Sequence, residues 1–532
     1  MLKSSRATRG MVVAPHGLAA QSGLAVLREG GNAAEAAVAT AASLAVVYPH
    51  MTGIGGDAFW MLRTPGRTPV CIDAAGRSPA DLTIQHYRAR GFDAIPARGP
   101  LAANTVAGAV SAWSAALEQS REEWGGRLPL ARLLADAIEY AGQGYPVTGS
   151  QAATTATRQP DLAELPGFAG VFLDGGKARG EGGVERQPAL AGTLRQLAEA
   201  GLEDFYRGGI AESVAAALQT IGSPVKRRDI AAHRAVLTPP LSVAFGSGRL
   251  YNTAPPTQGL ASLMILALFD RAGGHRLRPD SAEYMHLLVE ATKLAFRVRD
   301  RHVRDPRDMD VSAQDLLGDS ALAELAARID LQRAAPWGGA GDIGDTTWFG
   351  AVDGEGRAVS AIQSLYHEYG SGVVLRDTGI LWQNRGTGFS LEPGSPRALL
   401  PGRKPFHTLN PAMAVLGDGR FLVYGSMGGD GQPQTQAVLL TRIACFGVGV
   451  QNAITRPRWL LGRTWGANSN TLKIESRIDP AVVKSLARLG HDIEVVGEYD
   501  EVVGHAGAIA LDPSGVLEGG ADPRSDGVVA AF

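Results

Sequence analysis

The chain has 532 residues, of which 45% are apolar and 20% are charged, an ordinary composition for a soluble globular protein. Its 51 lysines and arginines nearly balance 53 aspartates and glutamates, giving a net charge of -2. This balance argues against nucleic acid or an anionic membrane as a partner. A chain of this length predicts two structural units or one large layered domain.

The N-terminus and the two cysteines bear on the compartment. No apolar stretch follows Met1–Arg6, so the sequence predicts no secretory signal. The most apolar segment, Ala33–Tyr48, contains Glu35 and is shorter than the roughly 20 residues that span a bilayer, so we expect a buried alanine-rich helix. Cys71 and Cys445 lie in apolar surroundings and are interpreted as buried thiols rather than a disulfide framework. These features predict a cytoplasmic protein.

From Ala14 to about Asp330 the pattern is mainly helical. Leu24–Ala45 is rich in alanine, and apolar residues recur at three- and four-residue spacing in Leu128–Gly142, Ala189–Ala200, Gly209–Ile221 and Ser281–Arg301. Short strand-like pieces interrupt these helices at Pro69–Asp73 and Gly248–Asn252. The glycine-rich, charged stretch Gly167–Gln187 predicts a surface excursion.

The character of the sequence changes at Pro336. Trp337–Asp345 is a turn-prone linker of small residues. Strand signals follow at once, with turn residues where hairpins need them, in Thr346–Val352, Ala358–Gln363, Gly379–Trp382 and Ala412–Leu416. Helices are predicted over Gln434–Val448 and Pro480–Leu489. The chain therefore divides into a helix-rich part, residues 1–345, and a part that begins as sheet, residues 346–532.

Several common catalytic motifs are missing from the sequence. It contains no G-x-S-x-G, H-E-x-x-H, G-x-G-x-x-G or P-loop motif, and its histidines lack metal-ligand spacing. We therefore expect neither a metal nor an organic cofactor.

The junction between Asp345 and Thr346 offers a different chemistry. A threonine hydroxyl is a weak nucleophile, but at a free N-terminus its own α-amine, with a pKa of about 7.7–8.0, can act as the base. Freeing that amine requires cleavage of the backbone before Thr346, and a mobile glycine-rich linker would let the hydroxyl reach the preceding carbonyl. When Asp345–Phe349 is considered alone, a strand that merely begins with two threonines is the better explanation.

Motifs elsewhere favour the catalytic interpretation. They occur, in chain order, at Gly30–Ala37, Thr52–Phe59, Asp204–Gly208, Asp345–Thr347, Gly370–Gly372 and Gly425–Gln434. In this order and spacing the chain resembles the γ-glutamyltransferase family of self-processing N-terminal-nucleophile hydrolases, from about Ala14 to near the C-terminus. The resemblance implies an α+β fold, a four-layer αββα sandwich. It also implies a large subunit, residues 1–345, and a small subunit, residues 346–532, cut from one precursor.

The same resemblance assigns catalytic roles. Thr346 falls on the family nucleophile, so the cleavage site is the bond between Asp345 and Thr346. Ser364 falls where the family has a threonine that hydrogen-bonds the nucleophile and assists processing, and serine keeps the hydroxyl. Gly428 and Gly429 match the glycine pair whose backbone N–H groups form the oxyanion hole. A plain turn is the alternative for these glycines.

The substrate pocket departs from the γ-glutamyl pattern. Ala75 stands where the family has an arginine that grips the glutamyl carboxylate, and Arg77 is near but out of register. Gly388 replaces the aspartate that should hold the α-ammonium. A buried glutamyl amine would then lack compensation, at a cost of several kcal/mol. The pattern argues against γ-glutamyl transfer as the main activity.

The other pocket positions favour a smaller substrate. Tyr366 and Arg385 replace an asparagine and a glutamine, and His407 with Thr408 replaces a pair of serines. Tyr366 and His407 add bulk, while Arg385 can hold a carboxylate bidentately. A solvated arginine at a strand end is the alternative for Arg385. The combination resembles the family branch that hydrolyses oxamate, a two-carbon amide acid of purine-nitrogen salvage.

The resemblance thus implies an amidohydrolase that releases ammonia and passes through an acyl-threonine ester. We expect the carboxylate of the substrate on Arg385 and its carbonyl toward Gly428 and Gly429. Three alternatives stay open: a γ-glutamyl hydrolase or transferase with a rebuilt pocket, an acylase for β-lactam side chains, and an unprocessed binding protein. The expected partners are a small amide and the sister subunit of the same precursor, with a homo-oligomer of such heterodimers left open.

Overall fold

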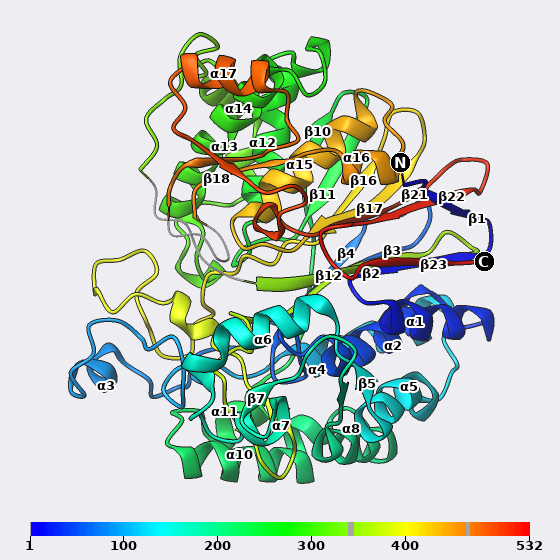
Figure 1. Cartoon of the computed structure of the whole chain (residues 1–532), viewed down its shortest axis with the longest axis vertical. Coiled ribbons are helices and arrows are strands. Elements are labelled where there is room, and N and C mark those ends of the chain that lie inside the picture. The colour runs from blue at the N-terminus through cyan, green and yellow to red at the C-terminus, as the bar shows by residue number, and fades with distance from the viewer. Residues whose placement is uncertain (1, 339–344, 464–468) are drawn as a thin grey trace.

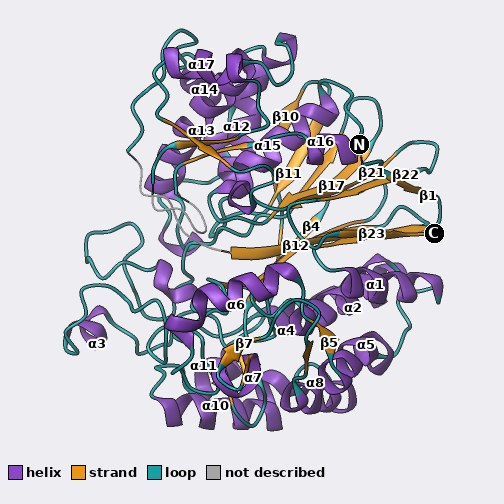
Figure 2. Cartoon of the chain, viewed as in Figure 1, coloured by secondary structure: helices purple, strands orange, loops and turns teal. Residues whose placement is uncertain are grey.

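The computed structural model describes residues 2–338, 345–463 and 469–532, and for Asp345 only the backbone. Two seven-stranded antiparallel sheets lie face to face in the middle of the molecule, and helices cover both outer faces (Figure 1 and Figure 2). The expected four-layer αββα sandwich is confirmed.

The first sheet contains the strand that begins at the predicted cleavage site. Its strand order is β23 (Val528–Ala531), β2 (Gly10–Ala14), β12 (Asp345–Asp353), β13 (Ala358–Tyr366), β3 (Asp57–Arg63), β4 (Val70–Asp73) and β9 (Val236–Thr238). The second sheet has the order β1 (Ser5–Ala7), β22 (Leu517–Ala521), β21 (Ala506–Leu511), β17 (Phe421–Ser426), β16 (Ala412–Val415), β11 (Gly248–Asn252) and β10 (Leu241–Phe245).

Strands from both predicted parts of the chain therefore combine in both sheets. The expectation that residues 1–345 are mainly helical was too simple, because this part also supplies seven strands of the two sheets. The strands β2 and β3 are buried on nearly every residue, so they lack the alternation that marks a half-exposed strand.

The helices on the outer face of the first sheet come from the first part of the chain. They are α1 (Gly17–Arg28), α2 (Ala33–Val47), α3 (Ile84–Arg88), α4 (Ala109–Trp124), α5 (Leu130–Gln143), α6 (Gly149–Leu162), α7 (Phe168–Phe172), α8 (Pro188–Ala200), α9 (Asp204–Arg207), α10 (Gly209–Ile221) and α11 (Arg227–Ala232). Every residue of α2 is buried, which confirms the expected alanine-rich helix. Two small hairpins pair β5 (Tyr145–Pro146) with β8 (Val184–Glu185) and β6 (Leu173–Asp174) with β7 (Lys177–Ala178).

The outer face of the second sheet is covered by α12 (Gly259–Arg271), α13 (Ala282–His302), α14 (Asp319–Ala326), α15 (Gly431–Ala444), α16 (Val450–Thr455) and α17 (Pro480–Arg488). A small sheet is formed by β18 (Trp459–Leu461), β19 (Leu472–Glu475) and β20 (Ile493–Val496), and a hairpin by β14 (Val374–Leu375) and β15 (Ile380–Leu381). Short 3-10 helices occur at η1 (Gly274–Arg276), η2 (Pro306–Asp308), η3 (Asp315–Leu317), η4 (Arg385–Gly388) and η5 (Glu501–Val503).

Trp348 locks the start of β12 between the two sheets. Its indole Nε1 donates a hydrogen bond to the Ser360 hydroxyl, 3.0 Å away. The ring occupies the space that side chains at Gly425 and Gly507 would need, because a Cβ there would lie 2.1 Å and 2.3 Å from ring carbons. This fit fixes the strand two residues beyond Thr346.

Other sequence expectations can be compared with the fold. Cys71 is buried, Cys445 is partly buried, and both are free thiols, as expected. Across the described ranges of the chain, none of the helices combines the length and apolar character needed to cross a bilayer.

Candidate active site

Thr346 lies at an irregularity in the ladder between β12 and β13. Asp345 pairs with Tyr366 and Thr347 pairs with Gln363, so the register shifts at Thr346. A bulge of this kind redirects the side chain at its centre. Thr346 is only 1% exposed, and its Oγ1 accepts a hydrogen bond from Gln432 Nε2 at 3.1 Å.

Ser364 lies on the neighbouring strand at the level of the bulge. Its hydroxyl is buried and accepts a hydrogen bond from the backbone N–H of Tyr366 at 2.8 Å. On its other side Ser364 pairs with Asp57 of β3. Because directly opposed residues of an antiparallel ladder share a face, the two side chains emerge on the same side of the sheet.

Gly428 and Gly429 form the loop between β17 and α15. Their φ angles are +112° and +53°, and the first of these strongly favours glycine. Gln258 secures this loop, since its Nε2 donates to the carbonyls of Gly429 and Thr408, each at 2.8 Å. The helix α15 begins at Gly431, so its positive N-terminal end and the loop lie beside Thr346, where they can stabilise a developing oxyanion.

Replacing Gly428 with alanine is expected to lower kcat of the processed enzyme by about 10²-fold, because an alanine cannot readily hold this φ and the peptide N–H must turn away. A Cβ there would also lie 3.3 Å from Gly504 Cα. Gly447→Ala is the matched control, since Gly447 also has a positive φ, +62°, but faces open space. Equal kcat values for the two variants would contradict the oxyanion role.

A buried ion pair supports the loop from the other part of the chain. Arg299 of α13 donates to both carboxylate oxygens of Asp430, at 2.7 and 3.1 Å, and to Gln258 Oε1 at 2.9 Å. Burial alone would lower the pKa of Arg299, but Asp430 and Asp300 raise it. The sequence did not identify Arg299, Gln258 or Gln432 as site residues. Gln432 could have been found, because it and Asp430 belong to the motif Gly425–Gln434, but Arg299 and Gln258 lie in no motif.

Arg385 is the first residue of η4, and its side chain is only 1% exposed. Its guanidinium carbon lies 3.6 Å from the ring centroid of Tyr366, which in turn stacks on His367. Within the described part of the chain, no hydrogen-bond partner reaches any of its three nitrogens. The alternative of a solvated arginine at a strand end is therefore wrong. A buried cation held in this way is expected to bind an anion.

Two neighbouring features shape the space around Arg385. Tyr366 has a φ of +81°, an unusual conformation that its hydrogen bond to Ser364 helps to hold. At Gly388 a Cβ would lie 3.0 Å from Arg385 Nη2. A side chain at this position would therefore crowd the guanidinium.

His407 and Thr408 are fully buried. His407 Nε2 lies 3.2 Å from Asp57 Oδ2. Burial lowers the pKa of His407, Asp57 opposes that shift, and the cationic Arg385 adds to it, so the ring is neutral near pH 7. No described residue hydrogen-bonds to His407 Nδ1 or to the Thr408 hydroxyl.

Ala75 and the nearby Arg77 mark the place where the sequence comparison expected a carboxylate-binding arginine. Ala75 is buried, and Arg77 forms an ion pair with Asp305 at 3.1 Å. Arg77 Nη1 also contacts the carbonyl of Gly402 at 3.4 Å. Arg77 is therefore engaged by Asp305 and by the backbone of Gly402.

A small cavity adjoins Thr346. Its volume of about 20 Å³ is enough for about one water molecule. It is lined by residues that include Thr346, Thr347, Tyr48, Met427 and His505.

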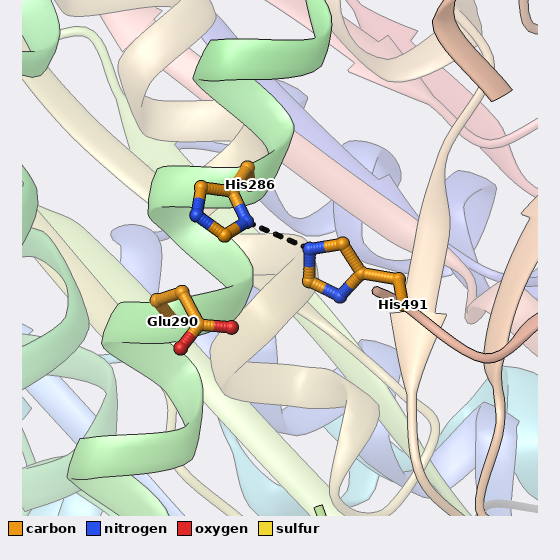
Figure 3. A group of neighbouring side chains, drawn as sticks. All are labelled: His286, Glu290 and His491. Atoms are coloured by element: carbon orange, nitrogen blue, oxygen red, sulfur yellow. Dashed lines mark hydrogen bonds between the residues drawn. The ribbon is translucent and has the colours of Figure 1, made fainter. Parts of the chain in front are cut away.

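One group of metal-ligating side chains is brought together that the sequence did not suggest (Figure 3). His286 Nδ1 and His491 Nε2 are 2.7 Å apart, and His286 Nε2 contacts the carbonyl of Asp330 at 2.8 Å. The carboxylate of Glu290 accepts hydrogen bonds from Lys293 Nζ and the Ala335 N–H, at 2.7 and 3.1 Å. These contacts tie the segment 330–335 to α13, which is a structural role.

The geometry of Thr346 and the glycine loop can be compared with known proteins. A sequence profile described as Gamma-glutamyltranspeptidase matches residues 19–532. The chain belongs to the γ-glutamyltranspeptidase family. It is an N-terminal-nucleophile hydrolase, as its sequence motifs implied.

Within the γ-glutamyltranspeptidase family, the relatives span the whole chain. It is 55% identical over 532 residues to an oxamate amidohydrolase proenzyme of Klebsiella pneumoniae, with 100% of both chains covered. It is 42% identical to a glutathione hydrolase-like YwrD proenzyme of Bacillus subtilis, with 99% of both covered. The crystal structure of a cephalosporin acylase from Bacillus halodurans aligns with a TM-score of 0.90 and 34% identity, covering 100% of this chain and 97% of the other.

Proposed function

We propose that this protein is a precursor that cleaves itself before Thr346 and then hydrolyses oxamate to oxalate and ammonia. The observation that carries the substrate is the buried guanidinium of Arg385, stacked on Tyr366 and without a hydrogen-bond partner in the described residues. The name of the 55% identical relative, an oxamate amidohydrolase proenzyme, supports the same choice.

Processing uses the same hydroxyl as catalysis. Thr346 Oγ1 attacks the carbonyl carbon of Asp345, and the nitrogen of Thr346 leaves as an amine, so the peptide becomes an ester. Water hydrolyses that ester, which frees the carboxylate of Asp345 and the hydroxyl and α-amine of Thr346. The products are a large subunit, residues 1–345, and a small subunit, residues 346–532.

The mature site then repeats this chemistry on the substrate. The α-amine of Thr346 takes the hydroxyl proton as Oγ1 attacks the amide carbon of oxamate, and Gly428 and Gly429 face the oxyanion. Collapse transfers the proton to the leaving nitrogen, which departs as ammonia and leaves an oxalyl-threonine ester. Water, activated by the same amine, releases oxalate. The role proposed for the Ser364 hydroxyl is to hydrogen-bond Thr346 and to assist processing.

Arg385 binds the carboxylate next to the scissile amide. Tyr366 fixes the plane of the guanidinium, while His407 and Thr408 close the pocket to longer acyl groups. A planar cation with donors in a fixed fork fits a carboxylate bidentately. A glutamyl substrate would instead bring its ammonium group toward the cationic Arg385. Gly388 offers no carboxylate to pair with that ammonium, so binding would be unfavourable.

Purified mature protein is expected to release ammonia and oxalate from oxamate in equal amounts. Ammonia can be followed by a coupled dehydrogenase assay and oxalate by chromatography, with a γ-glutamyl anilide in parallel. Release from the anilide and none from oxamate would overturn the substrate assignment. It would favour the glutathione hydrolase-like activity for which the 42% identical relative is named. We further propose that the protein is cytoplasmic.

A further inference from the structure

Asp57 is the first residue of β3, and its side chain is only 1% exposed. One of its carboxylate oxygens is fully engaged. Oδ1 accepts hydrogen bonds from the backbone N–H of Gly76 at 2.9 Å and from Gln383 Nε2 at 3.1 Å. These two donors fix the orientation of the carboxylate and direct Oδ2 toward His407.

His407 is held in place around this contact. The backbone N–H of His407 donates to the Pro256 carbonyl at 2.8 Å, and its backbone carbonyl accepts from the Gln258 N–H at 3.0 Å. Its ring meets the Phe59 ring edge-on, with 5.0 Å between the ring centroids. The 3.2 Å between Nε2 and Asp57 Oδ2 is within hydrogen-bond range, although the N–H is not yet aligned with the oxygen. Such contacts often tighten only when substrate binds.

The chemistry of this contact determines the tautomer of the imidazole. A carboxylate only accepts hydrogen bonds, so the ring nitrogen facing it must carry the proton. A neutral imidazole has one proton, and His407 Nδ1 is then left as a bare acceptor. Among the described residues no donor reaches that nitrogen, and it is buried. The ring contacts Asp57, which pairs with Ser364 across the ladder, so it lies at the candidate site.

We propose that Asp57 is a positioning residue that fixes His407 as the Nε2–H tautomer, so that Nδ1 accepts a hydrogen bond from the N–H of the scissile amide. This inference rests on the proposed function. It makes the site selective for amides over esters of the same acid, because an ester places an oxygen lone pair where the amide places a donor. A buried acceptor left without its donor disfavours the ester.

The variant Asp57→Asn tests this tautomer directly. The amide oxygen of the introduced asparagine must stay on the Oδ1 side to accept from Gly76 and Gln383, so its NH₂ group faces His407 Nε2. The ring must then carry its single proton on Nδ1 and leave Nε2 unprotonated. A donor instead of an acceptor then faces the N–H of the amide. The expected result is a fall in kcat/KM of about 10- to 100-fold for oxamate. For monoethyl oxalate, which gives the same oxalyl-threonine ester, the fall should be less than about 5-fold.

The comparison uses kcat/KM because this parameter reports the steps up to acylation, which differ between the two substrates. Asp93→Asn is the matched control, since the Asp93 side chain is 98% exposed, and it should behave as the wild type. An equal loss on both substrates, or no loss on oxamate, would overturn the proposal. If Asp57→Asn does not process, His407→Leu takes its place and should likewise lose more activity on the amide than on the ester.

A readout without substrate separates this proposal from the proposed function. Nitrogen-15 NMR of histidine-labelled mature protein, assigned by subtraction of the His407→Leu spectrum, should show His407 protonated at Nε2 in the wild type and at Nδ1 in Asp57→Asn. A wild-type ring protonated at Nδ1 would overturn the positioning role. Wild-type protein inactive on both substrates but with the expected tautomers would instead reject the oxamate assignment.

Discussion

Replacing Thr346 with alanine is expected to leave the chain as one polypeptide and to abolish amidase activity. In the proposed mechanism the hydroxyl at this position is the attacking group both in self-cleavage and in substrate hydrolysis, and the α-amine is freed only by that cleavage. Denaturing electrophoresis should show a single full-length band for Thr346→Ala and two bands for the wild type. Ammonia release should fall to the level of a blank.

Two neighbouring variants control this prediction. Thr346→Ser keeps a hydroxyl and should still process and hydrolyse amides, though more slowly. Thr347→Ala should process normally, because the Thr347 hydroxyl donates a hydrogen bond to the Gln363 carbonyl at 2.8 Å within the sheet and so is not the attacking group. Mass spectrometry that found the bond between residues 345 and 346 intact in active wild-type protein would reject the mechanism.

Arg385→Met is expected to lower kcat/KM for oxamate by about 10²-fold or more, because truncating one partner of a buried, hydrogen-bonded charge pair typically costs about 2–5 kcal/mol. Steady-state ammonia release measures this loss, which should lie mainly in KM. Arg385→Lys should restore only part of it, since an ammonium lacks the planar fork and the stacking on Tyr366.

The neutral diamide oxamide provides the control substrate for Arg385→Met. It lacks the carboxylate, so the variant should hydrolyse it about as well as the wild type does. Arg376→Met is the control variant, because Arg376 is exposed. The melting temperature of Arg385→Met should equal or exceed that of the wild type, since a buried unpaired charge is removed. Unchanged kcat/KM for oxamate would remove Arg385 from the binding site.

The layers of the fold followed from the sequence because six short motifs occur in family order. Of the strands in residues 1–345, β4 and β11 were predicted from the sequence but the others were not, and β3 shows why. Its run of apolar residues at 58–62 is buried on both faces, and such a run has the same pattern in a strand as in a short buried helix. Hairpin turns made the strands after Thr346 easier to recognise.

The candidate site was only partly predictable. Thr346 lies in a motif, and the family resemblance pointed to Arg385 and His407, but the burial of Arg385 and the bulge at Thr346 depend on the completed fold. Asp57 lies 350 positions before His407, and Arg299 lies 131 positions before Asp430. Neither pair has a local signal, because only the packing of the layers brings these side chains together.

The position of β12 has a consequence for what happens after the backbone is cut. This strand lies in the interior of its sheet, hydrogen-bonded to β2 on one side and to β13 on the other. The two pieces of a chain cut before Thr346 would therefore be interwoven, and neither could depart without breaking the hydrogen bonds of both sheets. Halves synthesised separately would each lack interior strands, so we expect the mature pair to arise only from a chain that folds first and is cut afterwards.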